Sequence, residues 1–307
     1  MRQSVSPLLP AIRVWARRHQ QGLAASLFLL PGLIMFTVYV IAPIIESIGL
    51  SFYSWDGLGA AKYIGLENYV NLFSDEAFYT ALKNNIIWLF CYLLSVPAGL
   101  AIALLLNQTS KGIRFIKSVF FFPFVISQVV IGVIFTLFYD PSLGLFVKLL
   151  HFFDIKPIAV LSSAHWVTYG IIVAGLYPQI AYCMILYLTG LNNLRPDLIE
   201  AARLEGAHGW KMLFKIVLPQ LRAATFIAVV VTVIGSLRSF DMISIMTQGG
   251  PYGSSATLAY YMYEVALSEY GFRMGYGAAV ATVLFLIMLV FIVFILHRVY
   301  MQERETS

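Results

Sequence analysis

Charged residues and cysteines are scarce in this chain, and both shortages narrow what it can be. Only 11% of its 307 residues are charged, 60% are hydrophobic, and the mean hydropathy is +0.82. Soluble domains normally carry about twice this share of charge. The composition therefore excludes an ordinary soluble domain and predicts that lipid surrounds most of the chain. The two cysteines, Cys91 and Cys183, both fall inside apolar stretches, so no disulfide framework is expected.

The sequence also lacks the motifs of nucleotide, metal and catalytic sites. It contains no G-x-x-x-x-G-K-[ST] phosphate loop and no Gly-Lys pair. Its five histidines are scattered among separate loops and ends, without the spacing of metal ligands. We therefore expect that this chain is not an enzyme and binds no cofactor or metal of its own.

Long apolar stretches dominate what is present. Six of them are long enough to cross ~30 Å of hydrocarbon as helices. They cover residues 23–49, 82–106, 115–138, 166–188, 223–246 and 276–296. The expected fold is an all-α integral membrane protein with six transmembrane helices. Its domain organisation would be a cytoplasmic segment (1–22), a transmembrane domain (23–299) and a cytoplasmic tail (300–307).

The distribution of lysine and arginine predicts the topology, because these residues accumulate on the cytoplasmic side of membrane proteins. With the N-terminus inside, fourteen of the 20 lie in the cytoplasm and five lie outside. Arg238 falls within the fifth stretch. Both termini are therefore expected in the cytoplasm, and the net charge of +5 indicates topology rather than a nucleic-acid partner. The first stretch is interpreted as an uncleaved anchor, not a signal peptide.

One large cytoplasmic loop, residues 191–222, is charged and helix-prone. It contains "RPDLIEAARLEGAHGWKMLFKIVLPQLR". Asp197 is predicted to cap a first helix, Gly206 to permit a turn, and Pro219 to end or bend a second, amphipathic segment. One face of that segment is expected to carry Trp210, Leu213, Phe214 and Val217.

The spacing of this loop resembles a known motif. The pattern E-A-A, three residues, G, nine residues, I-x-L-P fits without a gap and comprises Glu200, Ala201, Ala202, Gly206, Ile216, Leu218 and Pro219. It is similar to the coupling motif of bacterial ATP-binding cassette (ABC) importer permeases. The resemblance implies that the loop docks, with Trp210 adding apolar contact, into a cleft on a separate ATPase subunit that holds ATP and Mg. The alternatives are a helix lying on the membrane surface and a Glu200 that only pairs with Arg203 or Arg195.

Three further sequence segments resemble those of the sugar-type permeases of the maltose-system kind. They are "YIGLENYVNLF" at 63–73, "FDMISIMTQGGP" at 240–251 and "GYGAAVATVLF" at 275–285. The resemblance implies the first permease subunit of a heterodimer in a bacterial inner membrane. The implied partners are a second homologous permease, two ATPase subunits and a solute-binding protein. A neutral sugar is preferred as substrate, because the spans hold no basic cluster for a phosphorylated ligand.

Polar residues inside the spans are candidates for a substrate pathway, because such groups are costly in hydrocarbon. The first pair is Arg238 and Asp241, which could equally neutralise each other at i, i+3. A second set offers the aromatic faces and planar amides that suit sugars, although it could also serve only as contacts between helices. This set comprises Gln128, Tyr177, Gln179 and Tyr182.

Two other interpretations concern packing and rival functions. Small residues near the sixth stretch, including Gly275 and Gly277, are expected to pack against the partner permease. A secondary transporter of small polar solutes is the alternative function. It would need buried carboxylates for coupling ions, and Asp241 is the only clear one apart from Glu46 at the edge of the first stretch.

Overall fold

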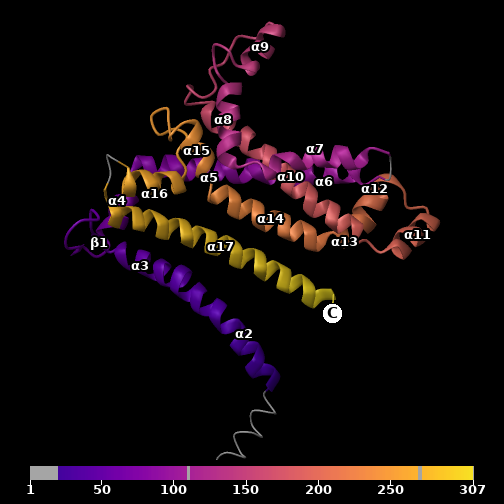
Figure 1. Cartoon of the computed structure of the whole chain (residues 1–307), viewed down its shortest axis with the longest axis horizontal. Coiled ribbons are helices and arrows are strands. Elements are labelled where there is room, and N and C mark those ends of the chain that lie inside the picture. The colour runs from indigo at the N-terminus through magenta and orange to yellow at the C-terminus, as the bar shows by residue number, and fades with distance from the viewer. Residues whose placement is uncertain (1–19, 109–110, 269–271, 307) are drawn as a thin grey trace, which may run out of the picture.

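The computed structural model describes residues 20–108, 111–268 and 272–306, and helices make up most of it (Figure 1). The elements in chain order are α2 (Gln20–Phe36), η1 (Thr37–Ile41), α3 (Ala42–Leu50), β1 (Tyr53–Ser54), β2 (Lys62–Tyr63), α4 (Glu67–Leu72), α5 (Glu76–Leu93), α6 (Ser95–Leu106), α7 (Ile113–Val125), α8 (Gln128–Phe138), α9 (Leu145–Phe152), α10 (Val167–Asn192), α11 (Pro196–Leu204), α12 (Gly209–Met212), η2 (Leu213–Val217), α13 (Leu218–Gln220), α14 (Arg222–Leu237), α15 (Asp241–Met246), α16 (Leu258–Leu267) and α17 (Met274–Thr306). Figure 1 places β1, α4 and α16 at one end of an elongated bundle and α11 at the other.

The described residues contain four helical stretches that are long and apolar enough to cross a membrane. They are Ser26–Leu50, Glu76–Leu106, Val167–Asn192 and Met274–Arg298. Two further pairs, α7 with α8 and the segment Gly209–Gln220 with α14, would bring the number to six if each counts as one span. The all-α membrane fold is thus confirmed, while the number of crossings stays a prediction.

Two of the predicted spans are not single straight helices. The stretch 115–138 divides into α7 and α8, which meet at an angle of 97°. The bend lies at Ile126 and Ser127, where the backbone turns extended and the Ser127 hydroxyl accepts a hydrogen bond from the Val129 amide at 3.3 Å. The stretch 223–246 breaks between α14 and α15. Both stretches were predicted only from the number of consecutive apolar residues, and that number does not reveal where a helix ends and a new one begins within the stretch.

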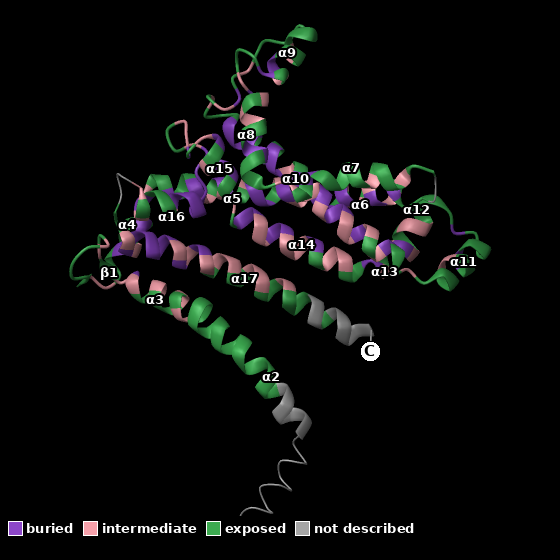
Figure 2. Ribbon diagram, in the orientation of Figure 1, coloured by how far each residue is buried: buried purple, intermediate pink, exposed green. Residues whose placement is uncertain are grey.

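The first apolar stretch, from α2 to α3, stands apart from the other helices along most of its length (Figure 1). No residue in its most apolar part is buried within the chain, and Figure 2 shows residues 26–36 of α2 as exposed. Aliphatic and aromatic side chains left uncovered over such a length fit a lipid or protein environment rather than water.

Close contacts at glycines hold the remaining helices together. A Cβ added at Gly99 of α6 would lie 2.5 Å from the Cβ of Cys183 in α10. A Cβ at Gly175 of α10 would lie 2.1 Å from the hydroxyl oxygen of Tyr92 in α5. These two positions let α10 approach both neighbours closely, as small residues do between membrane helices.

The glycines at the start of α17 pack within the chain, so their predicted role against the partner permease is wrong. A Cβ at Gly275 would lie 1.8 Å from the carbonyl oxygen of Tyr53, in the two-stranded hairpin of β1 and β2. A Cβ at Gly277 would lie 2.6 Å from the Cβ of Ala266. The hairpin folds back over Gly275, a long-range contact that small-residue spacing could not reveal, whereas Gly277 packs against α16.

A single carboxylate joins three helices near the same end. One oxygen of Asp75 caps α5 by accepting a hydrogen bond from the Ala77 amide at 2.9 Å. Its other oxygen accepts hydrogen bonds from the hydroxyls of Tyr261 in α16 and Tyr276 in α17, the latter at 2.7 Å. Partial burial raises the pKa of Asp75, but these hydrogen bonds together outweigh it and leave the pKa below its usual value.

Candidate functional sites

A cavity of about 270 Å³ lies where five helices meet, and it gathers four of the predicted pathway residues. We call it the central cavity. Its lining comprises Trp88, Tyr92, Gln128, Gln179, Val231, Ile234, Gly235, Arg238, Ser239, Phe240, Asp241 and Met242. The residues come from α5, α8, α10, α14, α15 and the link 238–240 between the last two, so the site depends on how these five helices pack together.

Gln128 and Gln179 reach the cavity for different structural reasons. Gln128 is the first residue of α8, directly after the 97° bend. Gln179 lies in the middle of α10, and its amide nitrogen donates a hydrogen bond to the hydroxyl of Thr232 in α14 at 2.9 Å. Gln179 therefore both contributes to the lining and joins two helices.

Arg238 and Asp241 lie on either side of a break in the chain. Arg238 caps the end of α14, and Asp241 is the first residue of α15. The prediction that they are neighbours on one helix is therefore wrong. Within the described residues their side chains form no ion pair with each other, although both line the cavity.

Tyr177 and Tyr182 are not part of this cavity. Tyr177 lines a separate, mostly apolar pocket of about 300 Å³ beside Val119 and Phe120. The ring of Tyr182 lies 5.3 Å from that of Phe124 in α7. Residues two apart on a helix do not share a face, which separates Tyr177 from Gln179.

The coupling segment, residues 195–222, projects from the end of the molecule opposite the hairpin (Figure 1). Gly206 adopts a left-handed conformation (φ +80°) between α11 and α12, which confirms the predicted turn. The Gln220 side chain closes the segment, because its amide oxygen accepts a hydrogen bond from the Arg195 backbone at 3.3 Å. A bend of 74° at Leu221 then joins the segment to α14.

Within the coupling segment, the motif residues divide between two surfaces. Glu200 is exposed, whereas Ala202 is buried. Trp210 and Phe214 stack on each other at 5.7 Å and are 74% and 59% exposed. Val217 instead packs into the cluster that contains Leu106 and Leu191.

Two local predictions for this segment are wrong. Asp197 does not cap α11, because Arg195 holds the cap position and Pro196 begins the helix; proline favours that first position. The expected shared face of Trp210, Phe214 and Val217 is also wrong. The π-helical turn from Leu213 to Val217 changes the residue spacing and turns Val217 inward.

Comparison with known proteins decides the family. The model of the family described as "Binding-protein-dependent transport system inner membrane component" matches residues 95–304. The chain belongs to this family. It is therefore a permease subunit of a binding-protein-dependent ABC importer, located in the inner membrane as a multi-pass protein, and not an enzyme.

The similarity of this permease to its relatives and to a solved structure extends over most of the chain. The permease is 35% identical over 277 residues to the probable ABC transporter permease protein YurN of Bacillus subtilis, covering 88% of this chain and 94% of the relative. It is 30% identical to the alpha-glucoside transport system permease protein AglF of Rhizobium meliloti, covering 85% and 78%. A chain from the crystal structure of a bacterial ABC transporter involved in the import of the acidic polysaccharide alginate matches with a TM-score of 0.81 and 25% identity, covering 96% and 100%. None of these matches supports a secondary transporter.

The sequence analysis missed two aromatic residues of the permease's cavity. Trp88 and Tyr92 of α5 line it, with ring centroids 5.0 Å apart. Trp88 is fully buried, and its indole N–H has no hydrogen-bond partner within the described residues. The signal that could have found them is their spacing, since Asn84, Trp88 and Tyr92 recur every four residues along one helix face.

Asn84 and Asn85 of the permease have a structural role. The Asn84 amide donates hydrogen bonds to the carbonyls of Ser254 and Ala256 at 2.7 and 2.8 Å. Asn85 donates to the carbonyl of Leu237 and accepts from the amide of Leu258. Together they fasten the loop before α16 to α5, which fixes one side of the cavity.

Proposed function

We propose that this permease forms half of the translocation pathway for a neutral sugar and is driven by ATP hydrolysis on a separate subunit. The observation that carries the proposal is the path of α14. This helix begins at the bend that joins it to the coupling segment and ends at Arg238, which lines the central cavity. Because we assign the substrate pathway to this cavity, we call it the translocation cavity from here on. One continuous helix thus connects the surface suited to an ATPase with the space suited to a substrate.

The cavity chemistry supports a sugar. Gln128 and Gln179 supply amide groups, which can donate and accept hydrogen bonds as hydroxyl-bearing ligands require. Trp88 and Tyr92 supply aromatic surface. Arg238 is accompanied by Asp241, so the lining has no net positive charge to favour a phosphorylated ligand. The naming of one relative as a trehalose/maltose transport permease supports the same class.

The coupling segment supports docking on an ATP-binding cassette subunit. Glu200 would pair with a basic or hydrogen-bonding group, Ala201 and Ala202 keep the helix narrow, and Gly206 sets the angle between the two helical parts. Trp210 supplies exposed apolar contact, and Ile216, Leu218 and Pro219 shape the return to α14. The exposure of Glu200 and Trp210 and the fixed turn at Gly206 are what this role requires.

The proposed assembly contains two permeases, two ATPases and a binding protein. The second permease is homologous and completes the cavity, while each ATPase binds ATP and Mg and contacts one coupling segment. A solute-binding protein delivers substrate to the outer loops, and both termini of this permease lie in the cytoplasm. ATP binding would move the coupling segment and α14 together and switch the cavity between its two open states.

Co-purification tests the proposal. The tagged permease is isolated from native membranes in mild detergent, and every accompanying chain is identified. ATP hydrolysis is then measured with candidate solute-binding proteins and a panel of sugars. We expect a second permease, an ATPase, and hydrolysis that rises with one sugar-loaded binding protein. Purification of the permease alone, with transport after reconstitution without ATP, would overturn the proposal.

A further inference from the structure

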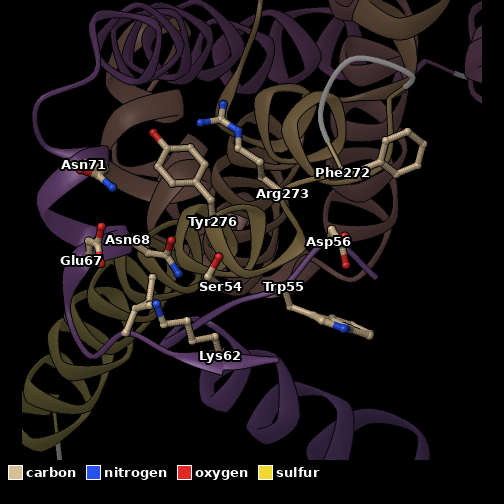
Figure 3. A pocket seen from close by; sticks show the side chains of 11 residues that line it. Ser54, Trp55, Asp56, Lys62, Glu67, Asn68, Asn71, Phe272, Arg273 and Tyr276 are labelled. Atoms are coloured by element: carbon tan, nitrogen blue, oxygen red, sulfur yellow. The ribbon is translucent and has the colours of Figure 1, made fainter. Parts of the chain in front are cut away.

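A second polar cavity lies at the hairpin end of the molecule, and it shares no lining residue with the translocation cavity. Its volume is about 390 Å³, and we call it the outer cavity. The lining comprises Ser54, Trp55, Asp56, Lys62, Ile64, Glu67, Asn68, Asn71, Phe272, Arg273 and Tyr276 (Figure 3). These residues come from the β1–β2 hairpin, α4 and the start of α17.

The walls of the outer cavity are fixed by buried contacts. Asn68 of α4 is buried, and its amide donates hydrogen bonds to the carbonyls of Ser51 and Tyr53 at 2.8 and 3.0 Å. The close approach of Gly275 to Tyr53 fastens α17 to the same strand. The hollow is therefore a built part of the fold and not a gap between unconnected loops.

Several polar side chains in this cavity are available to a ligand. Those of Lys62, Glu67 and Asn71 form no hydrogen bond or ion pair with the described residues, although all three line the hollow. The same holds for the side chains of Ser54 and Arg273, the guanidinium of Arg273 lying 4.6 Å from the ring centre of Tyr276. The lining therefore offers both hydrogen-bond donors and acceptors.

The charges of the cavity balance. Two cations, Lys62 and Arg273, face two carboxylates, Asp56 and Glu67. A ligand with a strong net charge gains little from such a lining, whereas each hydroxyl of a sugar can both donate and accept a hydrogen bond. Trp55 adds an aromatic surface, and its indole N–H donates to the carbonyl of Gly59 at 3.1 Å, which helps to orient the ring.

We propose that the outer cavity is a saccharide-binding site on the permease, separate from the translocation cavity. The volume falls within the usual range of small-molecule sites, about 300–1,000 Å³. The proposal extends the proposed function, because it assigns to the outer face a site for the same class of ligand. Tyr276 also donates a hydrogen bond to Asp75, so a sugar here would contact the group that joins α5, α16 and α17.

Site-directed labelling tests the proposal. Ser54→Cys places a thiol in the cavity, and the initial rate of its reaction with a membrane-impermeant maleimide is measured on the purified complex, with the unsubstituted complex as blank. The probes are millimolar glucose, maltose, trehalose and whichever sugar stimulates ATP hydrolysis, all without binding protein. Protection of about threefold is expected when one sugar exceeds its dissociation constant about twofold. Ser74→Cys, which lies outside the cavity lining, serves as the matched control and should not be protected.

A second substitution tests whether the lining of the outer cavity is responsible for the protection by sugar. Asn71→Leu in the Ser54→Cys background should abolish protection, while sugar-stimulated ATP hydrolysis remains within about twofold of normal because the translocation cavity is intact. No protection by any sugar in a complex whose hydrolysis still responds to sugar would overturn this inference alone. If sugar never stimulates hydrolysis, the proposed function fails, and the labelling rates then decide the outer cavity independently.

Discussion

The coupling segment and the translocation cavity are built from the sequence in opposite ways. The coupling segment is one continuous stretch, largely exposed, closed by a single hydrogen bond between Arg195 and Gln220. The translocation cavity takes its lining from five helices, and it exists only because those helices bend and cross at particular places. A continuous site can be altered at one residue without disturbing the fold, whereas an assembled site shares its residues with the packing of the bundle.

The largest effect is expected at the turn of the continuous site. Gly206 has φ +80°, a value that proline, fixed near −65°, cannot adopt. Gly206→Pro should lower sugar-stimulated ATP hydrolysis and uptake at least about tenfold, a cost of about 1.4 kcal/mol, with normal amounts of permease in the membrane. Glu200→Lys should act similarly.

Matched controls separate geometry from composition in that test. Gly206→Asn should retain most activity, because asparagine tolerates the left-handed region better than other side chains. Glu205→Lys changes an exposed charge outside the motif and should have little effect. Normal uptake by both Gly206→Pro and Glu200→Lys would contradict the docking role.

A smaller effect is expected in the assembled site. Gln179→Leu removes an amide from the cavity together with the 2.9 Å hydrogen bond to Thr232, so uptake should fall several-fold, about fivefold. Kinetics of uptake in whole cells at varied sugar concentration measure it. Tyr177→Phe is the control on the same helix, because Tyr177 lies outside this cavity. An equal loss in Tyr177→Phe would show that the cavity has been placed on the wrong face of α10.

Packing at the hairpin end gives a test of stability rather than transport. The added Cβ of Gly275→Ala would meet the Tyr53 carbonyl at 1.8 Å, so the free energy of unfolding should fall by about 1–3 kcal/mol. Gly49→Ala, which meets nothing within 4 Å, should leave it unchanged or raise it slightly. Thermal unfolding in detergent compares the two variants. Equal midpoints would mean that α17 does not approach the hairpin closely.

The smallest effect, on stability, is expected at Asp75, whose hydrogen bonds join residues from three separate helices. Its pKa is lowered in the folded chain, so its carboxylate stabilises the fold at neutral pH, and this contribution disappears as the pH falls below the ordinary value of 3.8. Asp75→Asn should cost about 1 kcal/mol at neutral pH and remove that part of the acid sensitivity. Thermal unfolding over an acidic pH series measures both, with Glu76→Gln as the neighbouring control. An unchanged acid profile in Asp75→Asn would assign the sensitivity to other carboxylates.

The sequence was most informative where the evidence is local. Apolar length predicted the helical membrane fold, and the spacing from Glu200 to Pro219 identified the loop that projects from the bundle. The turn at Gly206 followed from glycine's tolerance of positive φ. Each of these depends on residues that are close together in the chain.

Sites assembled from separate helices were harder to predict. Arg238 and Asp241 were predicted as one pair, and Gln128 and Gln179 as members of a second set. Only the fold shows that these four residues line the same cavity. Trp88 was missed because a tryptophan in an apolar run resembles any other core residue. The outer cavity was also not predicted from the sequence. It forms only because the hairpin folds back on α17, which brings together residues more than two hundred positions apart.

The 74° bend at Leu221 turns α14 into a pivoted rod. Its 16 residues span about 24 Å at 1.5 Å per residue. Rotation about the bend therefore moves the Arg238 end by about 0.4 Å for every degree. A tilt of about ten degrees displaces that end by about 4 Å, more than the length of a hydrogen bond. In the proposed mechanism, small movements of the coupling segment would thus be sufficient to make or break polar contacts to a substrate at the far end of one helix.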